Sequence, residues 1–137
     1  GHKHGTVGAV ARDSHGQIAA ATSTGGTCCK FPGRIGDSPL IGCGCYADAE
    51  AGGVSCTGHG EAIMKIVMAK AAADSLRAGA ASTAVAGECV RLLARRTQST
   101  GGLILLDPEG RPAASFNTPR MAYGYIEPSG SFHISPD

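Results

Sequence analysis

The sequence predicts an α+β domain in which strand hairpins lie on both sides of two consecutive helices. Strand-like apolar runs occur within 6–23 and 103–134, separated by short turns rich in glycine, proline and aspartate. Between them, two stretches place apolar residues three and four positions apart, the spacing of a helix with one buried face. Because the helices follow one another and do not alternate with strands, we expect them to form an outer layer on the sheets.

The first two strands are expected at Thr6–Arg12 and Gln17–Ser23. The intervening Asp13–Gly16 has the residues of a tight turn, with a glycine able to take positive φ, so the pair should form a hairpin. A loop-like stretch follows at 25–40, and loops of this length tend to be functional. Further strands are expected at 40–46, 54–57, 103–107, 112–117, 121–127 and 131–134.

The two helices are expected at 61–78 and 83–96. In the first, apolar residues that include Val67 recur at intervals of four, and Gly79 ends the pattern. Ser82 is suited to cap the N-terminus of the second helix, because its hydroxyl can accept from a free backbone N–H.

Composition limits the class of protein. The 137 residues suffice for one domain, and 42% of them are hydrophobic, enough for a buried core. The 12 basic and 11 acidic residues nearly balance, and aromatic residues make up 4%, so we expect no binding to nucleic acid or membrane. No apolar run reaches the roughly 18–20 residues of a membrane span and no secretory leader pattern is found, so a cytoplasmic location is expected.

The chain has six cysteines, at positions 28, 29, 43, 45, 56 and 89. Reduced thiols are expected in such a compartment. A zinc site is the alternative, since Cys43-x-Cys45 and Cys56-x-x-His59 group possible ligands. The paired C-x₂-C spacing of such sites is lacking, so we expect no metal centre.

Thr6 is the central candidate for chemistry. A threonine at a chain terminus can act as a nucleophile through its hydroxyl and as a base through its own α-amino group. Here the Gly5–Thr6 bond must first be cut. Thr24 ends the neighbouring strand, so the hairpin can bring the two hydroxyls within hydrogen-bond reach. A single threonine in a strand is otherwise ordinary.

The run Thr57–Glu61 is a second candidate. Free N–H groups where a helix begins, beside glycines that allow close approach, can receive negative charge. The Thr57 hydroxyl and the Gly58 N–H could therefore form an oxyanion hole. The same residues also fit a capped helix with Glu61 in its first turn. His59 is expected to be packed or solvated, because a terminal threonine carries its own base.

Arg34 and Asp37 lie three residues apart in the long loop. A guanidinium binds carboxylates through two parallel hydrogen bonds, and a carboxylate binds an ammonium group. Together they suit the zwitterionic end of an amino acid. The alternative is an ion pair between the two that braces the loop, which would contribute ~0–1 kcal/mol.

Four segments carry a resemblance to a known family: Gly5–Val10, Ala21–Gly26, Gly33–Pro39 and Thr57–Glu61. They resemble, in the same order, motifs of the β-subunit of plant-type L-asparaginases, also called isoaspartyl peptidases, which are N-terminal nucleophile hydrolases. The resemblance extends over 5–117. Related glycosylasparaginases have asparagine at the position of Gly25, so the plant-type branch is favoured.

The resemblance implies the β-subunit half of a four-layer αββα sandwich, with 6–137 as the β-subunit and 1–5 as the end of the α-segment or a leader. It implies hydrolysis of L-asparagine and β-aspartyl (isoaspartyl) dipeptides, with release of L-aspartate. A glycosylasparaginase-type amidase, or an unprocessed fragment that serves only in assembly, is the alternative. The implied roles are nucleophile for Thr6 after cleavage from Gly5, assistance for Thr24, substrate clamps for Arg34 and Asp37, an oxyanion hole from Thr57 and Gly58, and pocket lining for Gly60.

The resemblance also implies a partner. Family precursors are roughly twice this length, and they begin with an α-subunit that this sequence lacks. An isolated half would expose one face of its sheets, so we expect an α-subunit from the same precursor and an (αβ)₂ assembly. No cofactor is expected on this chain, and a structural sodium would belong to the α-subunit.

Overall fold

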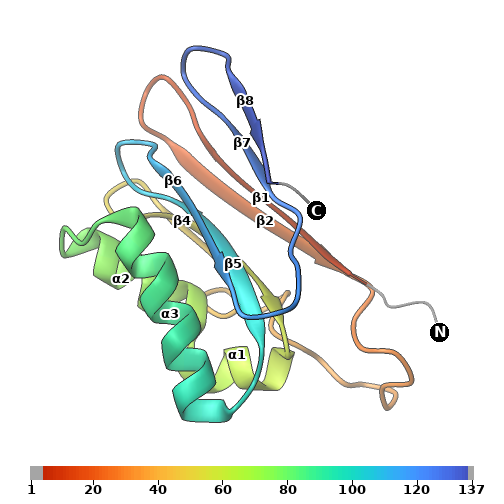
Figure 1. The fold of residues 1–137 in the computed structure, drawn as a ribbon. Coiled ribbons are helices and arrows are strands. Elements are labelled where there is room, and N and C mark those ends of the chain that lie inside the picture. The colour runs from red at the N-terminus through yellow and green to blue at the C-terminus, as the bar shows by residue number, and fades with distance from the viewer. Residues whose placement is uncertain (1–4, 136–137) are drawn as a thin grey trace.

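The computed structural model describes residues 5–135 and has an α+β architecture (Figure 1). Its strands are β1 (Thr6–Arg12), β2 (Ile18–Thr24), β3 (Cys45–Asp48), β4 (Gly52–Gly58), β5 (Gly101–Leu106), β6 (Pro112–Phe116), β7 (Gly124–Ile126) and β8 (Phe132–Ile134). Its helices are α1 (Gly60–Ile66), α2 (Met68–Arg77) and α3 (Ser82–Thr97). Most of the expected segment at 1–5 lies outside the described residues.

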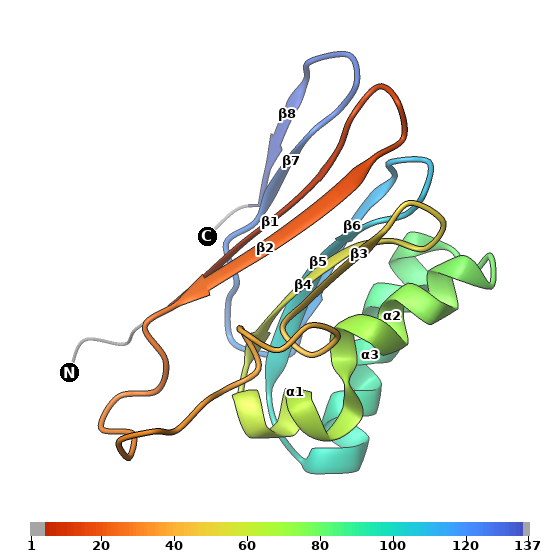
Figure 2. The same cartoon turned by 180° about the vertical axis from the view of Figure 1, so that it is seen from behind.

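The elements lie in successive layers. Strands β3 to β6 form an antiparallel sheet in the order β3-β4-β5-β6. The three helices cover one face of this sheet, and the β1–β2 hairpin lies over the other face (Figures 1 and 2). The β7–β8 hairpin lies beside β1–β2, on the side away from the helices. The predicted outer layer of helices is therefore present.

The core lies between the helices and the four-stranded sheet. Its largest fully buried side chains include Val54 and Leu103 from the sheet, and Ile63, Met68 and Leu93 from the helices. Burying a side chain of this size contributes about 1.5–3 kcal/mol. Strand β4 is buried along most of its length, so its last residues are held firmly where they reach the surface.

The β1–β2 hairpin packs closely on the sheet because two glycines leave room for it. A Cβ atom at Gly53 of β4 would lie only 2.5 Å from Val10 Cγ1 and 2.8 Å from Ile18 Cγ2. A Cβ atom at Gly8 of β1 would collide with the Ser55 side chain. Larger residues at these two positions would therefore push the hairpin away from the sheet.

The single helix predicted at 61–78 is wrong, because Val67 divides it into α1 and α2. Val67 has the left-handed conformation, with φ of 48° and ψ of 53°. The division frees N–H groups at the start of α2, and those of Ala69 and Lys70 donate to the carbonyls of Cys43 and Gly42. A β-branched residue is strained in this conformation, and these hydrogen bonds to the preceding loop offset the strain.

The strand predicted at 40–46 is also wrong in its extent. Turns occupy most of 40–44, and β3 begins at Cys45. The Gly44 N–H donates to the Asp37 carbonyl at 3.0 Å, and the Gly44 carbonyl accepts from the Cys56 N–H at 2.8 Å. Backbone groups that a strand would use in a ladder therefore attach this loop to β4 and fix the position of Asp37.

The N-cap predicted at Ser82 is wrong by one residue. Ser82 is already the first residue of α3, and the cap is Ala81, which makes no side-chain hydrogen bond to the helix. Ser82 is buried, so packing determines its place. None of the helices in 5–135 has the length and apolarity needed to cross a bilayer.

Candidate active site

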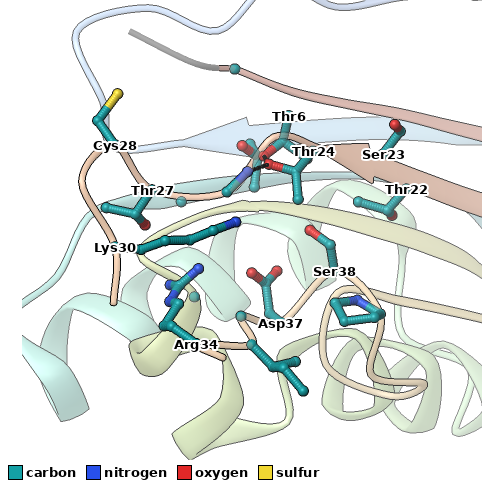
Figure 3. Close-up of a pocket in the computed structure, with 18 residues that line it drawn as sticks. Thr6, Thr22, Ser23, Thr24, Thr27, Cys28, Lys30, Arg34, Asp37 and Ser38 are labelled. Atoms are coloured by element: carbon teal, nitrogen blue, oxygen red, sulfur yellow. Dashed lines mark hydrogen bonds between the residues drawn. The ribbon is translucent and has the colours of Figure 1, made fainter. Parts of the chain in front are cut away.

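The predicted site residues come together around one pocket of about 730 Å³ (Figure 3). The start of β1, the end of β2, the long loop and the end of β4 all contribute to its wall. The predicted residues in the wall are Gly5, Thr6, Thr24, Arg34, Asp37, Thr57, Gly58 and Gly60. A cavity of this size is typical of sites for small molecules.

The two threonine hydroxyls meet across the β1–β2 hairpin. Thr6 and Thr24 are direct cross-strand partners in the antiparallel register. The Thr6 hydroxyl donates to Thr24 Oγ1 over a long distance of 3.4 Å, and the Gly26 N–H donates to the same Thr24 oxygen at 3.0 Å. The Gly26 contact orients Thr24, and Thr24 in turn stands beside the Thr6 hydroxyl.

Arg34 is held by a residue that the sequence analysis did not pair with it. Its Nε donates to Glu61 Oε1 at 2.6 Å and its Nη2 donates to Glu61 Oε2 at 2.8 Å, so the predicted alternative of an Arg34–Asp37 ion pair is wrong. The hydrogen bonds from Arg34 lower the pKa of Glu61 to about 2. Glu61 is in the first turn of α1, as expected. This pair orients the guanidinium at the edge of the pocket.

Asp37 is a buried carboxylate with an unsatisfied oxygen. The residue is only 7% exposed, and its Oδ2 has no hydrogen-bond partner among the described residues. Burial raises the pKa of the Asp37 carboxyl, while backbone N–H groups and the charge of Arg34 act in the opposite direction. A buried acceptor without a donor is uncommon in proteins, and an ammonium group in the pocket would satisfy it.

Gly60 lets the acidic and basic groups approach the start of α1. A Cβ atom there would lie 2.9 Å from Asp37 Oδ1 and 3.0 Å from Arg34 Nη2. Thr57 and Gly58 end β4 beside this glycine and line the same pocket. The N-cap of α1 is His59, which makes no side-chain cap hydrogen bond and does not line the pocket.

Several residues of the wall were not among the predicted site residues. Lys30 and Cys28 lie in the loop after Thr24, and Ser38 follows Asp37. A lysine in a loop of irregular sequence could have been assigned to the pocket only through the spatial path of that loop. Within the described residues, no cluster of three or more histidine, cysteine, aspartate or glutamate side chains could hold a metal ion.

The geometry thus combines two hydroxyls, a fixed guanidinium and an unsatisfied carboxylate around one small-molecule pocket. Comparison with known proteins assigns it to a family, because residues 1–135 match the asparaginase family. The chain belongs to this family. Its α+β architecture is compatible with the N-terminal nucleophile hydrolase fold that the asparaginase family implies. The predicted resemblance to plant-type L-asparaginases and isoaspartyl peptidases is confirmed.

Individual members of the asparaginase family are similar over most of this chain. The isoaspartyl peptidase of Escherichia coli (strain K12) is 48% identical over 128 residues, which cover 90% of this chain and 39% of that protein. A probable isoaspartyl peptidase/L-asparaginase of Drosophila pseudoobscura pseudoobscura is 46% identical over 129 residues, covering 93% and 40%. A plant-type L-asparaginase of Pyrobaculum calidifontis is 46% identical over 124 residues, covering 90% and 42%. The chain thus spans about two fifths of the length of these relatives.

Proposed function

We propose that this chain carries the nucleophile of a threonine hydrolase that releases L-aspartate from L-asparagine and from β-aspartyl dipeptides. The observation that supports it most directly is the pocket shared by the paired Thr6 and Thr24 hydroxyls, the oriented Arg34 and the unsatisfied Asp37. The names of the relatives, isoaspartyl peptidase and L-asparaginase, support the same substrates.

Both substrates present the same zwitterionic head to the pocket. Asp37 Oδ2 accepts from the substrate α-ammonium, which supplies the hydrogen bond that this buried oxygen otherwise lacks. Arg34 binds the α-carboxylate. Its Nε and Nη2 already bind Glu61, and a guanidinium has five N–H donors, so the remaining N–H groups serve the substrate.

The nucleophile is produced by cleavage of the chain at Gly5–Thr6. The Thr6 hydroxyl attacks the Gly5 carbonyl carbon, the C–N bond breaks, and the acyl group moves from nitrogen to oxygen as an ester. Water then hydrolyses the ester, which leaves a carboxylate on Gly5 and a free α-amino group on Thr6. Gly5 suits this step because its backbone can adopt strained conformations without a side chain to collide.

Turnover repeats the same chemistry on the substrate. The α-amino group of Thr6, with a pKa near roughly 7.7–8, takes the hydroxyl proton as Oγ attacks the β-amide carbon. The Thr57 hydroxyl and the Gly58 N–H stabilise the negative oxygen of the tetrahedral intermediate. The amine leaves with the proton as ammonia or as an amino acid. Water then cleaves the β-aspartyl ester and restores Thr6.

The open face of the hairpins suits a partner from the same precursor. Val7 of β1 is 73% exposed, and Phe132 and Ile134 of β8 are 73% and 81% exposed. An α-subunit that covers these apolar side chains would complete a four-layer αββα sandwich, and two such pairs would form (αβ)₂. A structural sodium, if present, belongs to that subunit.

Substituting Thr6→Ala tests the proposal, with Thr83→Ala on the exposed side of α3 as the matched control. Intact mass spectrometry measures processing, and aspartate release measures turnover of asparagine, a β-aspartyl dipeptide and a glycoasparagine. Thr6→Ala is expected to abolish both processing and turnover, whereas Thr83→Ala retains them. Hydrolysis by Thr6→Ala would contradict the nucleophile, and preference for the glycoasparagine would favour the glycosylasparaginase alternative.

A further inference from the structure

Lys30 lines the pocket but has no role in the proposed reaction. Its side chain lines the cavity and reaches across it between Arg34 and Thr24 (Figure 3). The Lys30 ammonium donates to the Gly25 carbonyl at 3.1 Å, a neutral acceptor. Lys30 is an exposed residue, so its ammonium is accessible to a ligand that enters the pocket.

The pocket holds one cation that the head of asparagine does not use. Lys30, Arg34 and Asp37 line the same cavity, and Glu61 balances the charge of Arg34, whereas Lys30 donates to the neutral Gly25 carbonyl. Asparagine has one ammonium and one carboxylate, which Asp37 and Arg34 bind in the proposed function. A β-aspartyl dipeptide has a second carboxylate, on the amino acid that leaves. Lys30 is the pocket cation that remains for it.

The position of Lys30 fits the leaving side of the scissile bond. Its ammonium donates a hydrogen bond to the carbonyl of Gly25, the residue after Thr24, and Thr24 contacts the Thr6 hydroxyl. Arg34 instead donates a hydrogen bond to Glu61, a residue of α1. A substrate with its head at Arg34 and its amide at Thr6 would therefore have its leaving group at the Thr24–Gly25 end of the pocket, where the Lys30 ammonium is hydrogen-bonded.

We propose that Lys30 binds the carboxylate of the leaving amino acid and makes β-aspartyl dipeptides better substrates than asparagine. This assignment rests on the proposed function and adds its substrate preference. Lys30 is a specificity residue that contacts the part of the substrate beyond the amide, and it takes no part in proton transfer.

The test compares two substrates that differ only in the charge concerned, β-aspartyl-alanine and β-aspartyl-alaninamide. The ratio of their kcat/KM values is measured in the complete protein for the wild type, Lys30→Met and Lys30→Arg. Lys65→Met is the matched control, since Lys65 is an exposed lysine of α1 that does not line the pocket. A ratio within one variant is independent of how much of that variant folds or matures.

The wild type is expected to favour the free acid by about tenfold or more, the effect of one hydrogen bond to a charged group. Lys30→Met should bring the ratio close to one, whereas Lys30→Arg and Lys65→Met should retain it. Added salt should lower the ratio in the wild type, because a charge pair at an open pocket is screened.

Two results would overturn the assignment. If Lys30→Met hydrolyses both substrates with the wild-type ratio of kcat/KM values, Lys30 does not bind the leaving carboxylate. This conclusion would hold even if kcat/KM fell equally for both substrates. Absence of aspartate release from every substrate in the processed wild type would instead remove the proposed function, and the assignment with it.

Discussion

Replacing Gly60 with alanine would introduce one methyl group where the acidic and basic groups of the pocket converge. The new Cβ would lie 2.9 Å from Asp37 Oδ1, 3.0 Å from Arg34 Nη2 and 3.1 Å from the Asp37 nitrogen. Ordinary contacts of a Cβ begin near 3.4 Å, so every one of these atoms must move. The Asp37 backbone cannot move easily, because its carbonyl accepts from the N–H groups of Leu40 and Gly44.

Overpacking of this kind costs about 1–3 kcal/mol. If the cost falls on the substrate clamp, KM for asparagine should rise about 5- to 150-fold. The fold should survive, because Gly60 is the first residue of α1 and is not among the glycines with positive φ, so alanine can adopt its backbone conformation. The processing of Gly5–Thr6 should also continue, since neither threonine of the hairpin is among the three atoms nearest to the new methyl group.

Aspartate release over a range of asparagine concentrations measures the effect, and intact mass measures processing. Gly87→Ala is the matched control, because its Cβ in α3 would meet only the flexible end of Arg91, at 3.3 Å. We expect Gly87→Ala to retain the wild-type KM. A processed Gly60→Ala protein with KM within twofold of the wild type would refute the reasoning, since neither Asp37 nor Arg34 could then be the substrate clamp.

Three further predictions concern stability and its dependence on pH. The raised pKa of Asp37 means that its ionised form destabilises the fold, so Asp37→Asn should melt at a higher temperature at pH 7, and the gain should vanish below the ordinary carboxyl pKa of 3.8. A gain that persists at low pH would point to another cause. The lowered pKa of Glu61 has the opposite effect, because its ionised form stabilises the fold. The wild type should be more stable than Glu61→Gln above pH 4.5, and the difference should fade as the pH falls toward about 2, the pKa of Glu61. Because Glu61 is 44% exposed, the difference should be ~0–1 kcal/mol in urea titrations, and a constant difference across this range would argue against the ion pair with Arg34. Val67→Asn should raise the free energy of unfolding by about 1 kcal/mol, because asparagine tolerates the left-handed conformation, and β-branched Val67→Thr should show no gain; equal melting of both variants would contradict the strain.

Much of the fold follows from patterns that depend on neighbours in sequence. The first hairpin was predicted with its first strand in place and its second strand shifted by one residue. The turn residues account for this success, because the Asp13 carboxylate accepts from the His15 and Gln17 N–H groups and Gly16 has a positive φ. The division of the predicted helix at Val67 could not be foreseen in this way. No glycine or proline marks it, and its hydrogen-bond partners lie in the loop at 42–43, which the same patterns had assigned to a strand.

The composition of the site was more predictable than its internal pairing. Residue types and spacing left two interpretations of Arg34 and Asp37, a clamp for a zwitterion or an ion pair between the two, and the family resemblance favoured the clamp. The hydrogen bond between Arg34 and Glu61 joins positions 27 residues apart. It depends on the tertiary packing of α1 against the loop, which sequence patterns do not specify. Lys30 was missed for the same reason.

The pairing of Thr6 with Thr24 has a consequence for the chain end that the proposed cleavage at Gly5–Thr6 would produce. A newly made chain end usually frays, because nothing opposes its motion. Here the residue that would become the end is also the first rung of a seven-residue ladder. In the proposed mechanism, the entropy of holding the attacking hydroxyl in place would therefore be lost once, when the hairpin folds, and each arriving substrate would meet an end that is already immobile.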